Sequence, residues 1–155
     1  MGGVNLKKNK IIRCPYCGSP AVLRSAEGIY KNNSAGAMLY VCSKYPACDS
    51  YVRVVPGTKI PAGSLANTAL RALRIETHRY FDLLFQTGIM SRAEAYEWLA
   101  CMLQMPLSQT HIGNLGEYYC RRVIEETKRL LENRKNLNEF WRERQYQQIA
   151  AGGGL

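Results

Sequence analysis

The chain has 155 residues, of which 46% are hydrophobic, and its 21 Lys and Arg outnumber its 12 Asp and Glu, giving a formal net charge of +9. This length accommodates one ordinary domain, or a small metal-stabilised module followed by a helical one. No apolar stretch is long enough to cross a membrane, and no signal-peptide core follows the N-terminus. We therefore expect no membrane association and a location in the cytoplasm.

The basic charge is concentrated in the N-terminal third of the chain. Up to Pro56 there are eight Lys or Arg and two acidic residues, whereas from Gly57 onward there are thirteen basic and ten acidic residues. A basic surface attracts polyanions, chiefly nucleic acid, because binding releases their counterions. The alternative is a solvated basic face without a partner. Residues 1–11 contain three lysines and are expected to form a flexible basic arm.

Residues 12–56 contain four of the six cysteines. Cys14 and Cys17 are spaced C-x2-C, and Cys42 and Cys48 are spaced C-x5-C. Gly18 directly follows the first pair and suits the tight turn of a metal-binding knuckle. Four thiolates around one ion leave no position open for water, which is typical of structural zinc. The sequence therefore predicts one structural Zn2+ ion bound by these four cysteines, in a reducing compartment.

Three short segments around these cysteines have β-strand character, at residues 21–24, 37–41 and 51–55. They are rich in β-branched and aromatic residues and are bounded by turn residues. We expect a zinc ribbon, a set of short antiparallel strands that is too small to hold together without its metal. A linker containing proline and glycine follows at residues 57–63.

Residues 64–148 show helical periodicity and predict a helical domain of three or more helices, so the fold class is α+β. The first helix is expected to begin after Ser64 as its N-cap and to end near Gln86. Ser91 and Glu94 form a capping box for a second helix, which ends near Gln104. The side chains expected to be buried in this domain are Phe81, Leu84, Tyr96, Leu99, Val123 and Leu130.

A third helix is predicted from about Leu115. Leu137 and Trp141 are candidate members of its apolar face, and the asparagines at positions 133, 136 and 138 are candidate break points. Residues 149–155 are expected to be a disordered tail. In an alternative helix-turn-helix arrangement of residues 92–124, the side chains facing the bases would be Gln109, Thr110, His111 and Asn114. Glutamates would then face phosphates, so three-helix packing is favoured.

The ribbon alternates aromatic and basic side chains, a pattern that can hold a single strand by base stacking and phosphate contact. The alternative is that the tyrosines pack the small ribbon core, and we expect two or three to do so in any case. We expect the basic surface to continue onto the first helix. The candidate nucleic-acid-binding residues are Arg13, Arg24, Lys31, Tyr40, Lys44, Tyr45, Arg53, Arg71 and Arg74.

His78 and Asp82 extend the stripe of Arg71 and Arg74 along the first helix. Their i, i+4 spacing favours a simple helix pair, and contact with a phosphate or a partner protein is the alternative. His111 is interpreted as a capping or packing residue. Cys101 and Cys120 are interpreted as core thiols, because no spacing supports a second metal site.

Two resemblances follow from these residues. The knuckles Cys14-Pro15-Tyr16-Cys17-Gly18 and Cys42-Ser43-Lys44-Tyr45-Pro46-Ala47-Cys48 resemble those of the C-terminal zinc ribbons of bacterial type IA topoisomerases. That resemblance covers about residues 12–55 and implies binding of single-stranded DNA. Topoisomerase activity itself is excluded, because the chain is too short for the cleavage domain and its catalytic residues.

The whole chain resembles a family of small zinc-finger-containing proteins from phages and from prophage regions of Gram-positive bacteria. This resemblance rests on the ribbon, on the segment Pro61-Ala62-Gly63-Ser64-Leu65-Ala66-Asn67, and on Ala95-Tyr96-Glu97-Trp98-Leu99-Ala100. It implies a zinc-binding fold and a phage setting within the host cytoplasm. It carries no activity with it.

Three classes of function are compared. The leading hypothesis is a phage accessory protein whose ribbon binds nucleic acid, DNA in preference to RNA, as a single strand or with low sequence specificity. The second is a protein-interaction module that docks a host enzyme, polymerase or defence complex. An enzyme is not expected, because no nucleophile–base pair, paired carboxylates or phosphate loop is present. The C-terminal helix is a candidate site for homo-oligomer formation.

Overall fold

The structure is a computed structural model that describes residues 10–152, with the side chains at positions 136–138, 141, 144 and 148 excepted. The expected arm up to residue 9, the last three residues of the expected tail, and the side chains of Leu137 and Trp141 therefore lie outside the described residues. The chain divides into two compact units, Met1–Ala72 and Leu73–Leu155. They are called the ribbon unit and the helical unit below, and each is described by itself.

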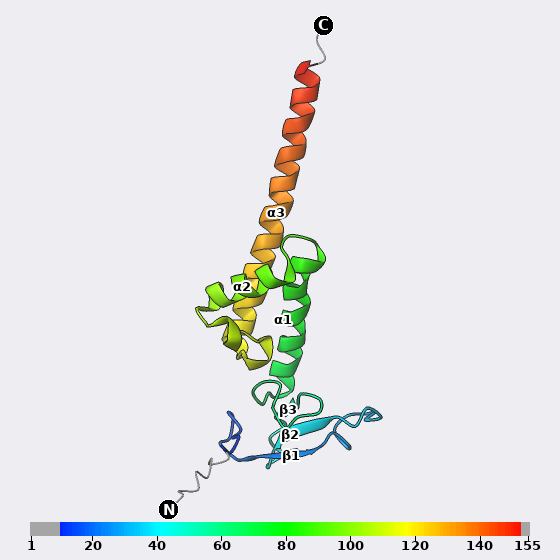
Figure 1. Cartoon of the computed structure of the whole chain (residues 1–155), viewed down its shortest axis with the longest axis vertical. Helices are drawn as coiled ribbons and strands as arrows, with labels where there is room; N and C mark the ends of the chain where they lie inside the picture. The colour runs from blue at the N-terminus through cyan, green and yellow to red at the C-terminus, as the bar shows by residue number, and fades with distance from the viewer. Residues whose placement is uncertain (1–9, 153–155) are drawn as a thin grey trace, which may run out of the picture. The chain divides into compact units, whose positions relative to one another are not determined.

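The ribbon unit contains one small antiparallel sheet (Figure 1). Its strands are β1, Ala21–Ser25, β2, Met38–Cys42, and β3, Tyr51–Arg53, in the order β1-β2-β3. These strands confirm the three predicted segments, with shifts of one or two residues at their ends. The central strand is the most buried, because it has a hydrogen-bonded neighbour on each side.

Each face of the sheet carries a small hydrophobic cluster. On one face Leu39 and Val41 pack with Ala26, and the partly buried rings of Tyr30, Tyr45 and Tyr51 lie against this cluster. The other cluster consists of Cys14, Cys42 and Leu65, with Tyr40 packed against it. Both clusters have only three buried members, so the ribbon has very little apolar core. The expectation that two or three tyrosines pack this core is exceeded, because four of them do so, Tyr30, Tyr40, Tyr45 and Tyr51.

The expected linker at residues 57–63 is part of the ribbon unit. Val54 pairs with Pro61 and Tyr51 pairs with Ala66, each as an isolated antiparallel bridge. Leu65 beyond it is only 2% exposed. This segment therefore covers the outer edge of β3, which would otherwise present unpaired backbone groups.

Helix α1, Thr68–Gln86, begins three residues later than expected. Ser64 is not its N-cap. Instead, the Asn67 side chain accepts a hydrogen bond from the backbone N–H of Leu70 at 3.0 Å, the pattern of an N-cap residue. Asp49 also accepts a hydrogen bond from the backbone N–H of Thr68, at 3.1 Å. The pairing of residues 61–66 with β3 delays the helix, because that backbone is extended.

The helical unit consists of the remainder of α1, then α2, Arg92–Leu103, and α3, Glu117–Gly152, with two short 3-10 turns between α2 and α3 (Figure 1). The Phe81 ring is fully buried, and its centroid lies 5.0 Å from that of Tyr96 in an edge-on contact. Of the side chains expected to be buried, Phe81, Leu84, Leu99 and Val123 are buried, whereas Tyr96 and Leu130 are half-buried.

The ends of α2 confirm the sequence signals. The Ser91 side chain accepts a hydrogen bond from the backbone N–H of Glu94 at 3.1 Å, and Gln104 ends the helix in the left-handed conformation. The 3-10 turns cover Leu107–Gln109 and Ile112–Asn114. The residues considered for base contact lie in or beside these turns, and Thr110 is fully buried, which contradicts a helix-turn-helix arrangement.

Helix α3 is continuous over 36 residues. The asparagines at 133, 136 and 138 do not break it, because each costs a helix only a few tenths of a kcal/mol more than alanine, roughly 0.5. The expected disordered tail is helical as far as Gly152. All described side chains from 132 to 152 are exposed. No helix among the described residues combines the length and apolar character needed to cross a lipid bilayer.

Candidate metal centre

The first knuckle is a tight turn that brings Cys14 and Cys17 together. The Gly18 N–H donates to the Cys14 carbonyl at 2.9 Å, and the Cys14 N–H donates to the Ser19 carbonyl at 2.8 Å. Gly18 has a φ of +72°, a left-handed conformation that favours glycine. The glycine that follows the second cysteine in the sequence is therefore required by the geometry of the turn.

The second knuckle follows the end of β2 directly. Cys42 is the last residue of that strand, and the chain then turns so that the Tyr45 N–H donates to the Cys42 carbonyl at 2.9 Å. The Cys48 N–H donates to the Lys44 carbonyl at 3.0 Å. Cys42 is buried and Cys48 is half-buried. A buried strand thus fixes one sulfur, and a hydrogen-bonded turn fixes the other.

The four sulfurs form one compact group. The Sγ atoms of Cys17 and Cys42 are 3.4 Å apart, those of Cys14 and Cys48 are 3.6 Å apart, and all four lie within 4.8 Å of one another. A tetrahedral zinc ion with Zn–S bonds of about 2.3 Å separates its sulfurs by about 3.8 Å. The donor set and spacing therefore fit Zn2+. A zinc ion with four thiolate ligands has no open position and acts as a crosslink between the two knuckles.

The protein environment affects the thiols unequally. A hydrogen bond from the Ser19 hydroxyl, and a second from the Ser19 backbone, lower the pKa of Cys17 to about 6. Burial raises the pKa of Cys42 to about 12. For Cys14, burial acts to raise the pKa, but hydrogen bonds, the strongest from the Ser50 hydroxyl, outweigh it and leave the pKa below its usual value. Metal ligation requires thiolates, so the ion itself has to favour the deprotonation of Cys42.

These features define the molecule as an α+β protein with a four-cysteine zinc ribbon and one structural zinc ion. The chain belongs to a family of zinc-finger-containing domains, whose model matches residues 10–130. No curated protein and no solved structure matches the chain significantly. Among the described residues, no second group of three or more His, Cys, Asp or Glu forms a metal site.

The candidate nucleic-acid-binding residues of the ribbon differ in exposure. The basic ones, Arg13, Arg24, Lys31, Lys44 and Arg53, are all exposed. Tyr40 and Tyr45 are half-buried in the two hydrophobic clusters, and the Tyr40 hydroxyl donates to the Lys59 carbonyl at 2.6 Å. The cations of the ribbon are therefore accessible, whereas the aromatic rings are largely used in packing.

Arg71 has a structural environment within the ribbon unit. Its guanidinium lies 3.7 Å from the centroid of the Tyr51 ring, and it donates to the Asp49 carbonyl at 2.8 Å. It also donates to the Ala66 carbonyl. Arg71 thus joins the second knuckle to the first turn of α1. These contacts leave its side chain 23% exposed.

Arg74 lies in the helical unit and is only 8% exposed. Its Nε donates to the Leu115 carbonyl at 3.0 Å. The expectation that the basic surface continues onto Arg74 is therefore wrong, because this guanidinium is buried among residues of the helical unit. Nearby on α1, His78 is exposed and Asp82 is half-buried, and no hydrogen bond or ion pair between them occurs in the described part of the chain.

Two residues that directly follow the second knuckle, Asp49 and Ser50, were not expected from the sequence to contribute to this region. Ser50 is fully buried, with its Oγ atom 3.0 Å from the Sγ of Cys14. Asp49 accepts hydrogen bonds from both the backbone and the side chain of Thr68, and these bonds lower the pKa of its carboxyl group. Their position directly after Cys48 was the available signal, because residues next to a metal ligand often hydrogen-bond to the site.

Proposed function

We propose that the ribbon binds nucleic acid with low sequence specificity, through phosphate contacts made by its exposed cations. One observation carries this proposal. In the register of the sheet, Arg24 on β1 and Arg53 on β3 both pair with the same residue, Leu39 on β2. Residues in one cross-strand row share a face, so the two arginines flank Leu39 on one side of the sheet.

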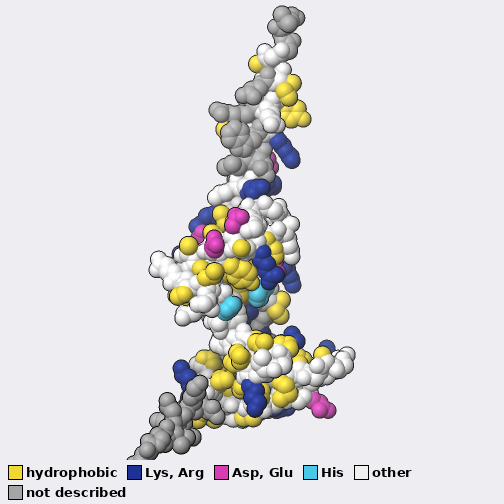
Figure 2. All heavy atoms as spheres, viewed as in Figure 1, with side chains coloured by type: hydrophobic (Ala, Val, Ile, Leu, Met, Phe, Trp, Pro, Cys, Tyr) yellow, Lys and Arg dark blue, Asp and Glu magenta, His cyan; other side chains and the backbone are white. Residues whose placement is uncertain are grey.

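This arginine row suits a polyanion. Neighbouring strands are about 4.8 Å apart, so the two Cα atoms are separated by roughly 10 Å across the sheet. Both side chains are exposed, and no acidic residue lies within these three strands. The bound zinc site contributes a charge of about −2, which leaves the ribbon positive. Figure 2 shows Lys and Arg side chains spread over the ribbon, whereas acidic side chains gather mainly on the helical unit.

The aromatic rings favour weak rather than specific base contact. Tyr30, Tyr45 and Tyr51 form edge-on pairs with centroids 6.4 Å apart, and they lie on the same face as the arginine row. One side of the Tyr51 ring is occupied by Arg71. Tyr16 is 46% exposed, but the other rings named here are partly buried in packing, so we expect phosphate contacts to supply most of the affinity. The topoisomerase-like knuckles support single-stranded DNA as the ligand, and the resemblance of the whole chain to small phage proteins supports a phage accessory role.

The test is fluorescence anisotropy with labelled single-stranded and duplex oligonucleotides over a salt series. Replacing Arg24 and Arg53 with Glu should weaken binding of all sequences to a similar extent and reduce the salt slope by about one unit per lost contact. Arg79→Glu, an exposed position on α1, is the control for charge reversal. Unchanged affinity in the double variant, with zinc still bound, would refute nucleic-acid binding by this face.

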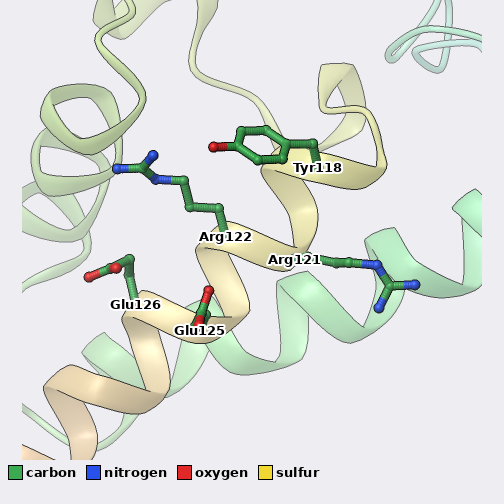
Figure 3. A pocket seen from close by; sticks show the side chains of 5 residues that line it. All are labelled: Tyr118, Arg121, Arg122, Glu125 and Glu126. Carbon is green, nitrogen blue, oxygen red and sulfur yellow. The ribbon is translucent and has the colours of Figure 1, made fainter.

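A second candidate function, protein interaction, is favoured by the surface of α3. Tyr118 is 67% exposed, and it lines a shallow hollow together with Arg121, Arg122, Glu125 and Glu126 (Figure 3). Further along the helix, Tyr146 and Ile149 are 76% and 74% exposed. Exposed tyrosines and arginines are enriched at the centres of protein interfaces. A second copy of the chain is the partner that can be tested directly.

Sedimentation equilibrium over a range of protein concentrations distinguishes this candidate. If α3 mediates self-association, the wild type should show a dimer that is lost when Tyr146 and Ile149 are both replaced by Ser. Arg24→Glu serves as the control, because a change in the ribbon should leave such a dimer intact. A monomer at all concentrations would refute self-association through α3 while leaving the nucleic-acid proposal unaffected.

A further inference from the structure

Ser50 contacts three of the four metal-binding cysteines. Its Oγ atom is 3.0 Å from the Sγ of Cys14 and 3.7 Å from the Sγ of Cys48. Its backbone carbonyl accepts a hydrogen bond from the Cys42 N–H at 3.0 Å. The residue is completely buried. A buried hydroxyl requires a hydrogen-bond partner, and the sulfurs provide it here.

We propose that Ser50 is a positioning residue of the zinc site, whose hydroxyl donates to the Cys14 thiolate and thereby strengthens zinc binding. The direction of the bond follows from the ligand chemistry. Thiolates bound to zinc carry no proton and can only accept, so the hydroxyl has to donate. A hydroxyl has one hydrogen, and the shorter distance assigns it to Cys14 rather than to Cys48.

Cys14 needs such a donor because of its burial. The side chain is only 2% exposed, so water contributes little to solvating its negative charge. Four thiolates and one Zn2+ ion together carry a charge of about −2. A hydrogen bond to a charged acceptor is roughly twice as strong as one between neutral groups. Removing the donor takes away this stabilisation of the buried charge, which raises the free energy of the zinc-bound state and so weakens zinc binding.

A purely space-filling role predicts a different result. Serine and alanine differ by one oxygen atom, so Ser50→Ala would be almost neutral if only packing mattered. Partners that hydrogen-bond to metal ligands typically contribute about 10–100-fold to metal affinity. The two interpretations therefore differ by at least an order of magnitude in the zinc dissociation constant.

The experiment measures zinc affinity of the full chain by competition with a chromophoric chelator at constant neutral pH. Ser50→Ala should bind zinc about 10–100-fold more weakly than the wild type. The matched control is Ser43→Ala, in the same knuckle but exposed, which should bind zinc like the wild type. Equal affinity for all three proteins would overturn the proposal.

Cobalt substitution provides a signature that a packing effect would not produce. A thiolate that loses a hydrogen bond becomes a stronger electron donor, so its charge-transfer band to Co2+ should move to lower energy in Ser50→Ala. Ser43→Ala should keep the wild-type spectrum. An unshifted band in Ser50→Ala, with cobalt bound by four thiolates, would contradict a hydrogen bond to Cys14.

The wild-type protein provides a test if Ser50→Ala does not fold. Loaded with cadmium-113, it should show a slowly exchanging Ser50 hydroxyl proton that is coupled to the metal through the Cys14 sulfur. A Ser50 hydroxyl proton that exchanges with water as fast as that of the exposed Ser43 would overturn the proposal without any variant.

Discussion

The ribbon unit buries Leu39, Leu65 and Val41 as its largest fully enclosed side chains, divided between two clusters. The helical unit encloses a larger set, which comprises Phe81, Leu84, Leu99, Ile112, Leu115 and Val123. Burial of one such side chain contributes about 1.5–3 kcal/mol. The three large side chains of the ribbon unit therefore contribute less to stability than the six of the helical unit.

The difference shows where each unit obtains its stability. In the ribbon, the two knuckles hold the metal, and the cluster on one face of the sheet includes two of the ligands, Cys14 and Cys42. Two of the metal ligands are therefore also part of the hydrophobic core of the ribbon. In the helical unit no described residue group binds a metal, and apolar packing between helices stabilises the fold. The two units should respond differently to the loss of the metal and to the loss of a core side chain.

Removing the metal should have the largest effect, and it should be confined to the ribbon. Structural zinc contributes about 10–16 kcal/mol in zinc-finger peptides at neutral pH, more than the ribbon can replace from its small clusters. After chelation, hydrogen exchange should show loss of protection in β1 to β3, whereas α2 and α3 keep theirs. Cys14→Ser should have the same effect as chelation. Cys101→Ser should not, because Cys101 lies outside the site and is exposed, which corrects its interpretation as a core thiol and leaves only Cys120 of those two buried.

Loss of protection in α2 and α3 on chelation would contradict the claim that only the ribbon unit depends on the metal. Zinc content is measured in the same samples, so that a failure to remove the ion is not mistaken for stability.

Phe81→Ala should have the next largest effect, with the opposite distribution. The ring is fully buried and contacts Tyr96 and Phe85 edge-on, and truncating such a ring costs about 3–5 kcal/mol. Thermal unfolding followed by far-ultraviolet circular dichroism should show a destabilised helical unit, while zinc affinity is unchanged. Ile75→Ala is the control on the same helix, because Ile75 is 62% exposed. A matching loss of zinc affinity would contradict independent units.

The zinc ligands and most elements could be predicted from the sequence because their signals are local. The spacing of four cysteines, the turn glycine Gly18 and the capping pair Ser91 and Glu94 each act within a few residues. The start of α1 could not be predicted, because it depends on the pairing of Tyr51 with Ala66. A helix predicted from apolar periodicity is extended toward the N-terminus through every residue that fits the pattern. The pattern contains no information about pairing with a strand that is distant in the sequence.

Long-range hydrogen bonds explain the remaining differences. Arg74 was expected to continue the basic surface of the ribbon onto the first helix, but its Nε donates to the Leu115 carbonyl, which lies 41 positions away in the chain. Asp49 binds the first residue of α1 across 19 positions. Neither partner can be identified by spacing. Predicting that Arg24 and Arg53 share a face of the sheet likewise requires the register of the strands. The positions of the strand segments in the sequence do not determine that register.

Arg71→Ala should have an intermediate effect within the ribbon unit. The change removes a cation–π contact with Tyr51 and hydrogen bonds to the carbonyls of Asp49 and Ala66, and we expect a loss of about 1–3 kcal/mol. Zinc affinity, measured by chelator competition, should fall because the second knuckle loses its support. Arg71→Lys should restore little, since an ammonium group cannot reproduce the planar stacking.

Arg53→Ala is the matched control for Arg71→Ala, because it also removes an arginine from the ribbon, but an exposed one. It should leave zinc affinity unchanged and weaken only oligonucleotide binding. If Arg71→Ala instead weakened oligonucleotide binding while zinc affinity stayed at the wild-type value, the guanidinium would be a binding residue rather than a structural one.

Ser91→Ala should have the smallest effect, and it tests whether a purely local change stays within the helical unit. The Ser91 hydroxyl satisfies the backbone N–H of Glu94, and loss of an N-cap serine costs about 1 kcal/mol. For a domain of this size the melting temperature should fall by about 4–8 °C, with zinc affinity unchanged.

Ser108→Ala, an exposed serine outside any cap, should have no measurable effect. A fall in the melting temperature of similar size for both variants would mean that the capping bond contributes nothing specific. A fall in zinc affinity for Ser91→Ala would mean that the stability of the ribbon unit is coupled to that of the helical unit. The contrast between a metal-stabilised ribbon and an independently packed helical unit would then be wrong.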